Sequence, residues 1–508
     1  MRTIRYVPTL VAAALIPAAI PVLLSASVIS NVLLVAQAPA KAQSAEAVGR
    51  IATVITVRLE GATQGSGVLV KREGDRYTVL TAWHVVSSQG PREELDIYTS
   101  DGKRHQLEQE SIKRIGDVDL AVLSFRSSGS YEVASIGDVK SVNSGSGIYV
   151  SGFPLPTSAV PIRLFRFLKG EVVANASVSI PNGYQLLYSN PTLPGMSGGA
   201  ALNAQGHLVG IHASAERADQ ISDRTGKAIA TGTNQAVPIT YYSQYSSGMP
   251  IVPSSIKAET ADDYLAQARA LLGKRGSEQK IIRLTSQVLN TVQNADAYFY
   301  RAYAKDDLGD KQGAIADLSR AIAINPRHTY SYYVRGIVKN DLGDTQAAIE
   351  DYSRLIQVDP QYAEAYYNRA HSRLVLGDTQ AAIDDYSMVI AIDPQNTNAY
   401  YNRGRTKGDS GDLEGAIDDY SKVISIDPQY SSAYNNRGLA RFNLGDKLGA
   451  IADLNKAIII SPGNSNSWVI RGVAKYNIGD RNGACEDIRK SVYLGSSVGK
   501  QFLGKVCP

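Results

Sequence analysis

Three polar side chains, His84, Asp119 and Ser197, have sequence neighbours that could support nucleophilic catalysis. His84 follows one β-branched, apolar run, Asp119 enters another, and Ser197 lies among glycines. A serine hydroxyl becomes a nucleophile when an imidazole accepts its proton and a carboxylate fixes the tautomer of that imidazole. These contexts predict acyl transfer to Ser197, with His84 as general base and Asp119 as orienting acid. Asp117 is an alternative acid, because it lies on the same side of an extended chain.

The glycines beside Ser197 allow a tight turn, in which the amides of Gly195 and Ser197 would form an oxyanion hole. The motifs Thr-Ala-x-His-Val, Asp-Leu-Ala-Val-Leu and Gly-x-Ser-Gly-Gly stand at residues 81–85, 119–123 and 195–199. Over roughly 200 residues the chain resembles the trypsin-like (chymotrypsin-fold) serine peptidases on these motifs. The resemblance implies two six-stranded β-barrels with the triad between them.

The residues before and after Ser197 bear on substrate specificity. Pro191 stands where trypsin-like pockets that select basic residues carry an acid, so a preference for Arg or Lys is disfavoured. Thr192 and His212 resemble the pocket of glutamyl endopeptidases, which implies a preference for Glu or Asp. A hydroxyl and a charged imidazole would suit an acidic side chain. The alternative is that His212 is a packed residue on a barrel strand.

The elements that must position these residues are predicted to be β-strands. Residues 48–252 contain short β-branched runs separated by Gly, Ser, Asn and Pro, which is typical of all-β structure. The runs 65–70 and 77–81 predict a hairpin across residues 71–76, and the second run leads directly to His84. We assign residues 43–252 to the peptidase domain and residues 253–260 to a linker.

Length and composition favour a globular protein of several domains. The chain has 508 residues, of which 44% are hydrophobic and 20% are charged. Of the net charge of +4, +3 belongs to residues 1–42, which leaves no basic surface that would favour nucleic-acid binding.

Residues 6–40 form an uncharged run that follows two arginines, and small residues come after it. This pattern predicts a signal peptide over residues 1–42. The protein would then be periplasmic or extracellular. An uncleaved membrane anchor is the alternative reading, and only in that case would the membrane be a partner.

The second half of the chain is an internal repeat of 34 residues. A glycine-aspartate pair recurs at this spacing, and so do an early aromatic residue, an alanine and a late proline. Glycine ends one helix in the left-handed conformation and aspartate caps the next, so each repeat predicts a helical hairpin that must stack on its neighbours. The pattern resembles tetratricopeptide (TPR) repeats. We predict a degenerate hairpin at 261–292, six repeats at 295–496 and a C-terminal cap at 497–508.

The resemblance to TPR proteins implies a protein or peptide partner on the concave face of an all-α solenoid. A second aromatic follows the packing aromatic in three repeats, so it cannot face the same way and is a candidate for ligand contact. A packing role is the alternative for any single ring. The predicted face has these residues: Tyr333, Tyr367, His371, Tyr401 and Arg405.

The chain has two cysteines, Cys485 and Cys507. In an exported protein they predict a disulfide, with two free thiols as the alternative. The proposed chemistry requires no metal and no cofactor. The sequence therefore predicts a multidomain protein, an all-β double-barrel serine endopeptidase followed by an all-α TPR solenoid that recruits a substrate or partner. The rival hypothesis is a non-catalytic scaffold that keeps a peptidase-like fold as a binding module.

Overall fold

The computed structural model describes residues 42–61, 63–87, 94–156, 160–177, 180–190, 192–214, 233–251 and 260–507. The predicted signal peptide, Pro191 and nearly all of the predicted linker lie outside the described residues. No helix within these ranges is both long enough and apolar enough to cross a membrane.

The first β-structure is a sheet of seven strands within the described residues, in the order β5-β4-β1-β2-β3-β7-β6. An isolated bridge between Leu107 and Phe125 links the chain just after β5 to β7. The resemblance implied a six-stranded barrel here, and this part has seven strands instead of six. The elements are α1 (Ala45–Ile55), β1 (Thr56–Gly61), β2 (Gly65–Glu73), β3 (Arg76–Thr81), α2 (Trp83–Val86), β4 (Leu95–Tyr98), β5 (Arg104–Gln106), η1 (Gln109–Ser111), β6 (Lys113–Arg114) and β7 (Ala121–Arg126).

The second β-structure is a closed barrel in the order β10-β13-β12-β11-β8-β9. Its inward side chains, among them Val150, Val209 and Ala236, form a buried core of their own. Its elements are η2 (Val139–Ser141), β8 (Gly147–Gly152), β9 (Arg166–Asn175), η3 (Pro181–Gly183), β10 (Leu186–Tyr188), β11 (Ala200–Asn203), β12 (Leu208–Ser214) and β13 (Asn234–Pro238), followed by α3 (Thr240–Ser246).

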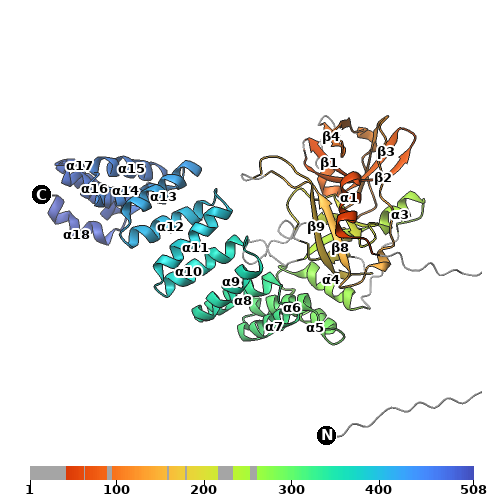
Figure 1. Cartoon of the computed structure of the whole chain (residues 1–508). Helices are drawn as coiled ribbons and strands as arrows, with labels where there is room; N and C mark the ends of the chain where they lie inside the picture. Colours follow the sequence, from red (N-terminus) through yellow and green to blue (C-terminus); the bar gives the residue numbers. More distant parts are fainter. Residues whose placement is uncertain are drawn as a thin grey trace, which may run out of the picture. The chain divides into compact units, whose positions relative to one another are not determined.

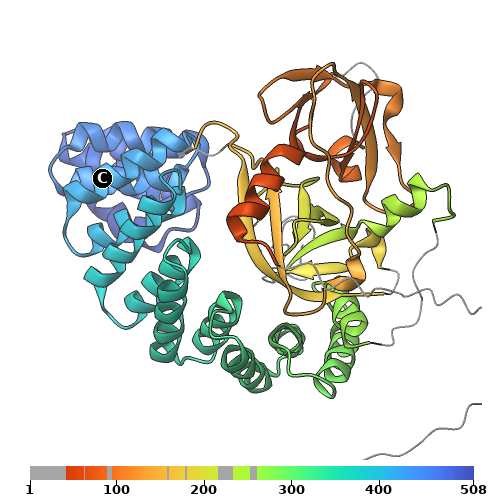
Figure 2. The same ribbon diagram turned by 45° about the vertical axis from the view of Figure 1, so that its right-hand side comes forward.

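Helix α1, drawn in red in Figure 2, is a feature that the all-β prediction for this region missed. Its buried residues Val48, Ala52 and Ile55 are spaced four and three apart, which places them on one helical face. That face packs into the core of the first sheet. The β-branched residues of the segment favoured a strand interpretation, but the helical spacing of its apolar positions decides the structure.

The predicted hairpin is present as β2 and β3, with Val68 paired to Leu80. The strands extend further than predicted and turn at Gly74, whose φ of 63° is left-handed. Six consecutive residues of β2, 65–70, are buried, so this strand is covered on both faces. It therefore forms a rigid base for the loops that meet at its first residues.

Residues 260–507 form helical hairpins that follow one another along the chain, as Figure 1 shows. The first pair precedes the six regular repeats, and a single helix follows the last. The helices are α4 (Ala261–Leu271), α5 (Glu278–Leu289), α6 (Ala295–Asp307), α7 (Lys311–Ile324), α8 (Thr329–Asp341), α9 (Thr345–Val358), α10 (Ala363–Val375), α11 (Thr379–Ile392), α12 (Thr397–Asp409), α13 (Leu413–Ile426), α14 (Ser431–Asn443), α15 (Lys447–Ile460), α16 (Ser465–Asn477), α17 (Arg481–Tyr493) and α18 (Ser497–Val506).

The repeated glycine-aspartate pair ends one helix and starts the next, as its chemistry predicts. Gly377, for example, has a φ of 82°, and the Asp378 side chain accepts a hydrogen bond from the N–H of Ala381 at the start of α11. The same left-handed glycine and capping aspartate recur in the other regular repeats.

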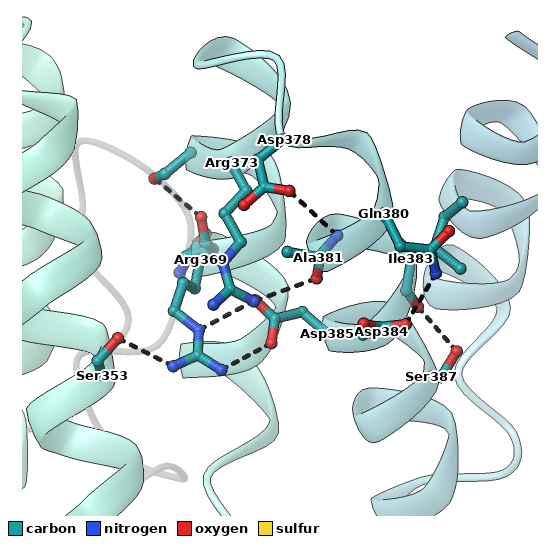
Figure 3. Close-up of polar contacts among 12 residues, drawn as sticks. Ser353, Arg369, Arg373, Asp378, Gln380, Ala381, Ile383, Asp384, Asp385 and Ser387 are labelled. Atoms are coloured by element: carbon teal, nitrogen blue, oxygen red, sulfur yellow. Dashed lines mark hydrogen bonds and ion pairs between the residues drawn. The ribbon is translucent and has the colours of Figure 1, made fainter. Parts of the chain in front are cut away.

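A charged ladder joins the hairpins, and Figure 3 shows one rung of it. Arg369 makes two hydrogen bonds to the buried Asp385 of its own repeat, at 3.0 and 2.7 Å, and a third to Ser353 of the preceding repeat at 2.9 Å. Arg373 also donates to Asp385, at 2.7 Å. The Arg369 guanidinium lies over the ring of Tyr366, 5.5 Å from its centroid. Each regular repeat has such a rung, made by Arg301, Arg335, Arg369, Arg403, Arg437 and Arg471.

The last helix, α18, is attached covalently as well as by packing. Cys485 on α17 and Cys507, just after α18, form a disulfide that spans 22 residues. Val506 and Phe502 pack against Ile488, which covers the apolar end of the last hairpin. A solenoid needs such a cap, because its terminal repeat has no following neighbour.

The first helices of the solenoid share a hydrophobic core with the second barrel. Val173 and Leu187 of the barrel belong to one buried cluster with Leu265 of α4 and Phe299 of α6. Two aspartates at the start of α4 add polar contacts: Asp262 accepts from the N–H of Asn175 at 2.9 Å, and Asp263 from that of Ser177 at 2.7 Å.

Candidate active site

The register between β3 and β7 brings His84 and Asp119 together. Thr81, the last residue of β3, pairs with Ala121, the first residue of β7. His84 follows on α2, and Asp119 lies two residues before the start of β7. His84 Nδ1 lies 2.7 Å from Asp119 Oδ2, and the backbone N–H of His84 donates to Oδ1 at 2.8 Å. One carboxylate thus holds both the ring and the backbone of the histidine.

Tyr184 makes a further hydrogen bond to this carboxylate. Its hydroxyl donates to Asp119 Oδ2 at 2.7 Å, and the N–H of Asp119 donates to the carbonyl of Asn182 at 2.8 Å. Burial alone would raise the pKa of Asp119, but the hydrogen bonds from His84 and Tyr184 and the attraction of His84 together lower it. Asp119 is therefore ionised at neutral pH although its side chain is only 5% exposed.

The alternative acid, Asp117, does not point at the histidine. It is exposed, and its backbone carbonyl accepts a hydrogen bond from Arg114 at 2.8 Å. The structure therefore assigns the contact with His84 to Asp119. A surface cleft adjoins this pair, and its lining includes Trp83, Asn182 and Tyr184.

Ser197 lies in a loop of the second barrel that the first sheet holds in place. The N–H of Ser66, in β2, donates to the Ser197 carbonyl at 2.8 Å, and the Ser66 hydroxyl donates to the Gly195 carbonyl at 3.1 Å. On the barrel side, the N–H of Gly198 donates to the His212 carbonyl at 2.6 Å. The loop is thus fixed by backbone contacts on both sides.

Gly65 shows that Ser197 and the helix of His84 are neighbours. A Cβ atom added to Gly65 would lie 3.2 Å from the Ser197 carbonyl oxygen and would also overlap the side chain of Val85. Val85 follows His84 on α2. A residue without a side chain is therefore required where the nucleophile loop, β2 and α2 meet.

The amides of Gly195 and Ser197 are available as donors, which an oxyanion hole requires. Within the described part of the chain, neither N–H donates a hydrogen bond to another residue. The preceding carbonyl, that of Pro194, accepts from the N–H of Leu155 at 2.8 Å, which holds the Pro194–Gly195 peptide in one orientation. The Ser197 hydroxyl also makes no hydrogen bond to another described residue, and such bonds often tighten only when substrate is present.

Arg163 is a buried cation beneath this loop. Its guanidinium donates to the carbonyls of Leu59 at 2.8 Å, Gly65 at 2.9 Å and Gly195 at 3.3 Å. Burial lowers its pKa to about 10, so it remains charged at neutral pH. Arg163 therefore connects the first sheet to the nucleophile loop through these carbonyl groups.

The two predicted specificity residues lie in a buried polar network. Tyr188 Oη lies 2.6 Å from His212 Nδ1 and 3.2 Å from the Gln235 carbonyl oxygen, and its single proton is donated to one of these two acceptors. The Thr192 hydroxyl donates to Asn234 Oδ1 at 2.5 Å, so its proton is engaged within the protein. His212 Nε2 is buried and has no hydrogen-bond partner among the described residues.

The charge state of His212 differs from the one that the sequence suggested for acidic recognition. Burial, together with the nearby His84, lowers the pKa of His212 to about 3. The imidazole is therefore neutral at neutral pH. It can donate from Nε2 only in the tautomer whose Nδ1 accepts the Tyr188 proton, and it does not supply a positive charge.

The tyrosines predicted for the concave face are half-buried. Their hydroxyls accept hydrogen bonds from an asparagine of the following repeat, as Tyr367 does from Asn402 at 2.7 Å. The ring of Tyr367 also lies 5.6 Å from that of Tyr386. Tyr333 and Tyr401 have equivalent contacts. His371 and Arg405 are exposed.

Sequence reasoning missed Tyr184, Ser66 and Arg163. Each acts through a contact with a residue distant in the chain, and none lies in a motif that indicates its role. In the described residues, no group of three His, Cys, Asp or Glu side chains could hold a metal ion. That the chemistry needs no metal or cofactor stays a prediction.

The chain carries a trypsin-like peptidase domain followed by several TPR repeats. Residues 65–211 match the trypsin-like peptidase domain family, and residues 295–328, 336–377, 363–396, 409–445 and 431–464 match TPR families. Similarity extends to the serine protease Do-like HtrA of Lactobacillus helveticus, 28% identical over 189 residues. That alignment covers 36% of this chain and 43% of the relative, so the chain matches less than half of that protein.

Among solved structures, a MamA protein is 29% identical, with a TM-score of 0.32 over 34% of this chain and 93% of its own. YrrB, a TPR protein described as having an unusual peptide-binding site, is 18% identical, with a TM-score of 0.33 over 36% of this chain and 94% of its own.

Proposed function

We propose that the protein is an exported serine endopeptidase whose TPR solenoid recruits a protein or peptide. Ser197 attacks the scissile carbonyl, His84 takes its proton, and the Gly195 and Ser197 amides stabilise the oxyanion. The observation that carries this proposal is the His84–Asp119 pair beside the loop of Ser197. Within the described residues, the Gly195 and Ser197 amides of this loop donate no hydrogen bond to another residue. The acyl-enzyme is then hydrolysed by water that His84 activates.

A fluorophosphonate probe tests the activity directly, because it reacts only with an activated serine. We expect labelling of the wild-type chain at Ser197 and none in Ser197→Ala. Ser66→Ala, which loses a hydrogen bond to the nucleophile loop but keeps Ser197, should be labelled more slowly yet still at Ser197. An intact wild-type protein that stays unlabelled would support the non-catalytic scaffold instead.

A preference for Glu or Asp before the cleaved bond is the finer part of the proposal. It rests on the buried, unpartnered Nε2 of His212, which could donate to a substrate carboxylate. Thr192 contributes less than the resemblance implied, because its hydroxyl proton is engaged by Asn234. Cleavage rates of peptides that differ only in the residue before the cleaved bond test this preference. Faster cleavage after Leu or Arg than after Glu would reject the preference.

Export is proposed from the leader and supported by the cysteines. Residues 6–40 carry no charge, and Cys485 and Cys507 are disulfide-bonded, which suits an oxidising compartment. Mass spectrometry of the N-terminus from fractionated cells tests this. A mature chain that begins near residue 43 in an extracytoplasmic fraction is expected, and an intact N-terminus in the cytoplasm would contradict it.

Partner binding is proposed for the concave face with Tyr333, Tyr367, His371, Tyr401 and Arg405. His371 and Arg405 are accessible, whereas the tyrosines offer one side of a half-buried ring. Arg405→Glu reverses an exposed charge without disturbing the ladder arginine Arg403. A natural substrate that binds the wild-type protein should be retained less by Arg405→Glu. Unchanged retention would exclude Arg405 from the partner-binding face.

A further inference from the structure

The buried polar network around Thr192 and His212 continues into the solenoid. Thr233 directly precedes β13, and its hydroxyl lies 2.8 Å from that of Tyr300 on α6. Arg269 of α4 donates from Nε to the same hydroxyl at 3.1 Å and from Nη2 to the Thr233 carbonyl at 3.4 Å. Two helices of the solenoid therefore bind one residue of the peptidase.

The residues after Thr233 hold both predicted specificity residues. Asn234 accepts the Thr192 hydroxyl at 2.5 Å, and its amide donates to the carbonyl of Asn190. The Gln235 carbonyl oxygen lies 3.2 Å from Tyr188 Oη, which contacts His212 Nδ1. A short segment of three residues thus connects α4 and α6 to Thr192 on one side and to His212 on the other.

Burial makes this connection stiff. Thr233, Tyr300, Tyr188 and His212 are fully buried, and Arg269 is 2% exposed. Buried polar groups that lose a partner are costly, so each bond constrains the next. The apolar contacts of α4 and α6 with β9 and β10 lie in one continuous cluster, which keeps the helices against the barrel.

We infer that Arg269 and Tyr300, in the first solenoid helices, are positioning residues for the substrate-specificity pocket. They fix Thr233, and through Asn234 and Gln235 they set the positions of Thr192 and His212. The base of the solenoid supports the pocket residues from behind, so a partner that alters the packing of α4 and α6 would alter selectivity. This inference rests on the proposed peptidase function.

The test uses the full-length protein and Tyr300→Phe, which removes one hydroxyl and keeps the ring in the core. Tyr298→Phe is the matched control on the same helix, because its hydroxyl bonds Gln293 at 3.0 Å instead of the barrel. Selectivity is the kcat/KM for a peptide with Glu before the cleaved bond divided by the kcat/KM for the same peptide with Leu at that position. This ratio does not depend on the fraction of folded protein, so it separates positioning from simple destabilisation.

We expect Tyr300→Phe to lower this ratio about fivefold, the effect of one neutral buried hydrogen bond. The rate of fluorophosphonate labelling, which uses no specificity pocket, should stay at the wild-type value. Arg269→Lys should lower the ratio in the same way, because an ammonium cannot reproduce the forked contact to Thr233.

Two outcomes overturn the inference while the proposed function stands: wild-type selectivity in Tyr300→Phe and Arg269→Lys, or an equal loss in Tyr298→Phe. A wild-type protein that is neither labelled nor active refutes the proposed function itself. The labelling assay therefore tells the two failures apart.

Discussion

The hydroxyl of Tyr184 offers a sharp test of the proposed mechanism. Asp119 Oδ2 accepts from both His84 Nδ1 and Tyr184 Oη, each at 2.7 Å, while Oδ1 accepts the backbone N–H of His84. Tyr184→Phe removes one of three donors and leaves the ring in place. The carboxylate would then be held less firmly and would share more negative charge with the imidazole.

The expected loss follows from these contacts. A hydrogen bond to a charged group contributes about 1.5–3 kcal/mol. Because a surface cleft adjoins Tyr184, water can partly replace the hydroxyl, and we take the lower value. A loss of ~1.5 kcal/mol from the transition state lowers kcat about tenfold. KM should stay unchanged, since the hydroxyl touches Asp119 and not the substrate.

The pH profile supplies an independent readout. A carboxylate with fewer donors stabilises the imidazolium better, so the pKa of His84 should rise in Tyr184→Phe; this offsets part of the loss from poorer orientation and makes tenfold the upper bound. Since His84 must be neutral to act as base, the acid limb of kcat/KM should move to higher pH. Tyr241→Phe is the control, because it removes an equally short hydrogen bond, 2.8 Å to Gln185, outside the triad. A change in KM alone, or the same profile in both variants, would refute this role.

Three further predictions concern stability. Burial lowers the pKa of His212 to about 3, and an unfolded histidine titrates near about 6.5, so the unfolded state binds more protons between these values. Stability against urea should fall as pH drops through this window, and parallel curves for wild type and His212→Gln would contradict it. Asp385→Asn should destabilise the solenoid by about 3 kcal/mol, because it leaves two partly buried arginine charges without their buried anion. In thermal or urea unfolding, Asp384→Asn, exposed and adjacent, should have little effect, and equal losses would count against the ladder. Replacing Cys485 and Cys507 with serine should cost about 3 kcal/mol through the 22-residue span, measured by unfolding with and without reductant, and an unchanged midpoint would exclude this contribution.

Local sequence signals were sufficient for much of the fold and of the site. The β2–β3 hairpin follows from its β-branched runs, and the repeat helices follow from a period of 34 residues. The contact of Asp119 with His84 follows from motif contexts, because the pairing of β3 and β7 is local to one sheet. The hairpin and the helices are encoded by residues close together in the chain or by strict repetition, whereas the contact of His84 with Asp119 joins residues 35 apart and follows from their motifs.

Other features depend on contacts between distant segments, which a single sequence does not reveal. Tyr184 is 65 residues from Asp119, and Arg163 is 98 from Gly65. The neutral state of His212 depends on complete burial beside Tyr188, and neither is visible in its motif. The charged ladder is different: its arginines and aspartates recur at the repeat spacing, so the signal was present but lacked a structural meaning without the fold.

The ladder has a consequence for how this solenoid can change in length. Each arginine uses the aspartate of its own repeat and a small polar residue of the preceding one, which is a serine at most junctions and Asn455 at the last, so the junctions present equivalent donors and acceptors. Removing residues 363–396 would place Arg403 against Ser353 in the role that Ser387 now has. Repeats are thus interchangeable units, and duplication or loss of one unit changes the reach of the solenoid without breaking a single rung.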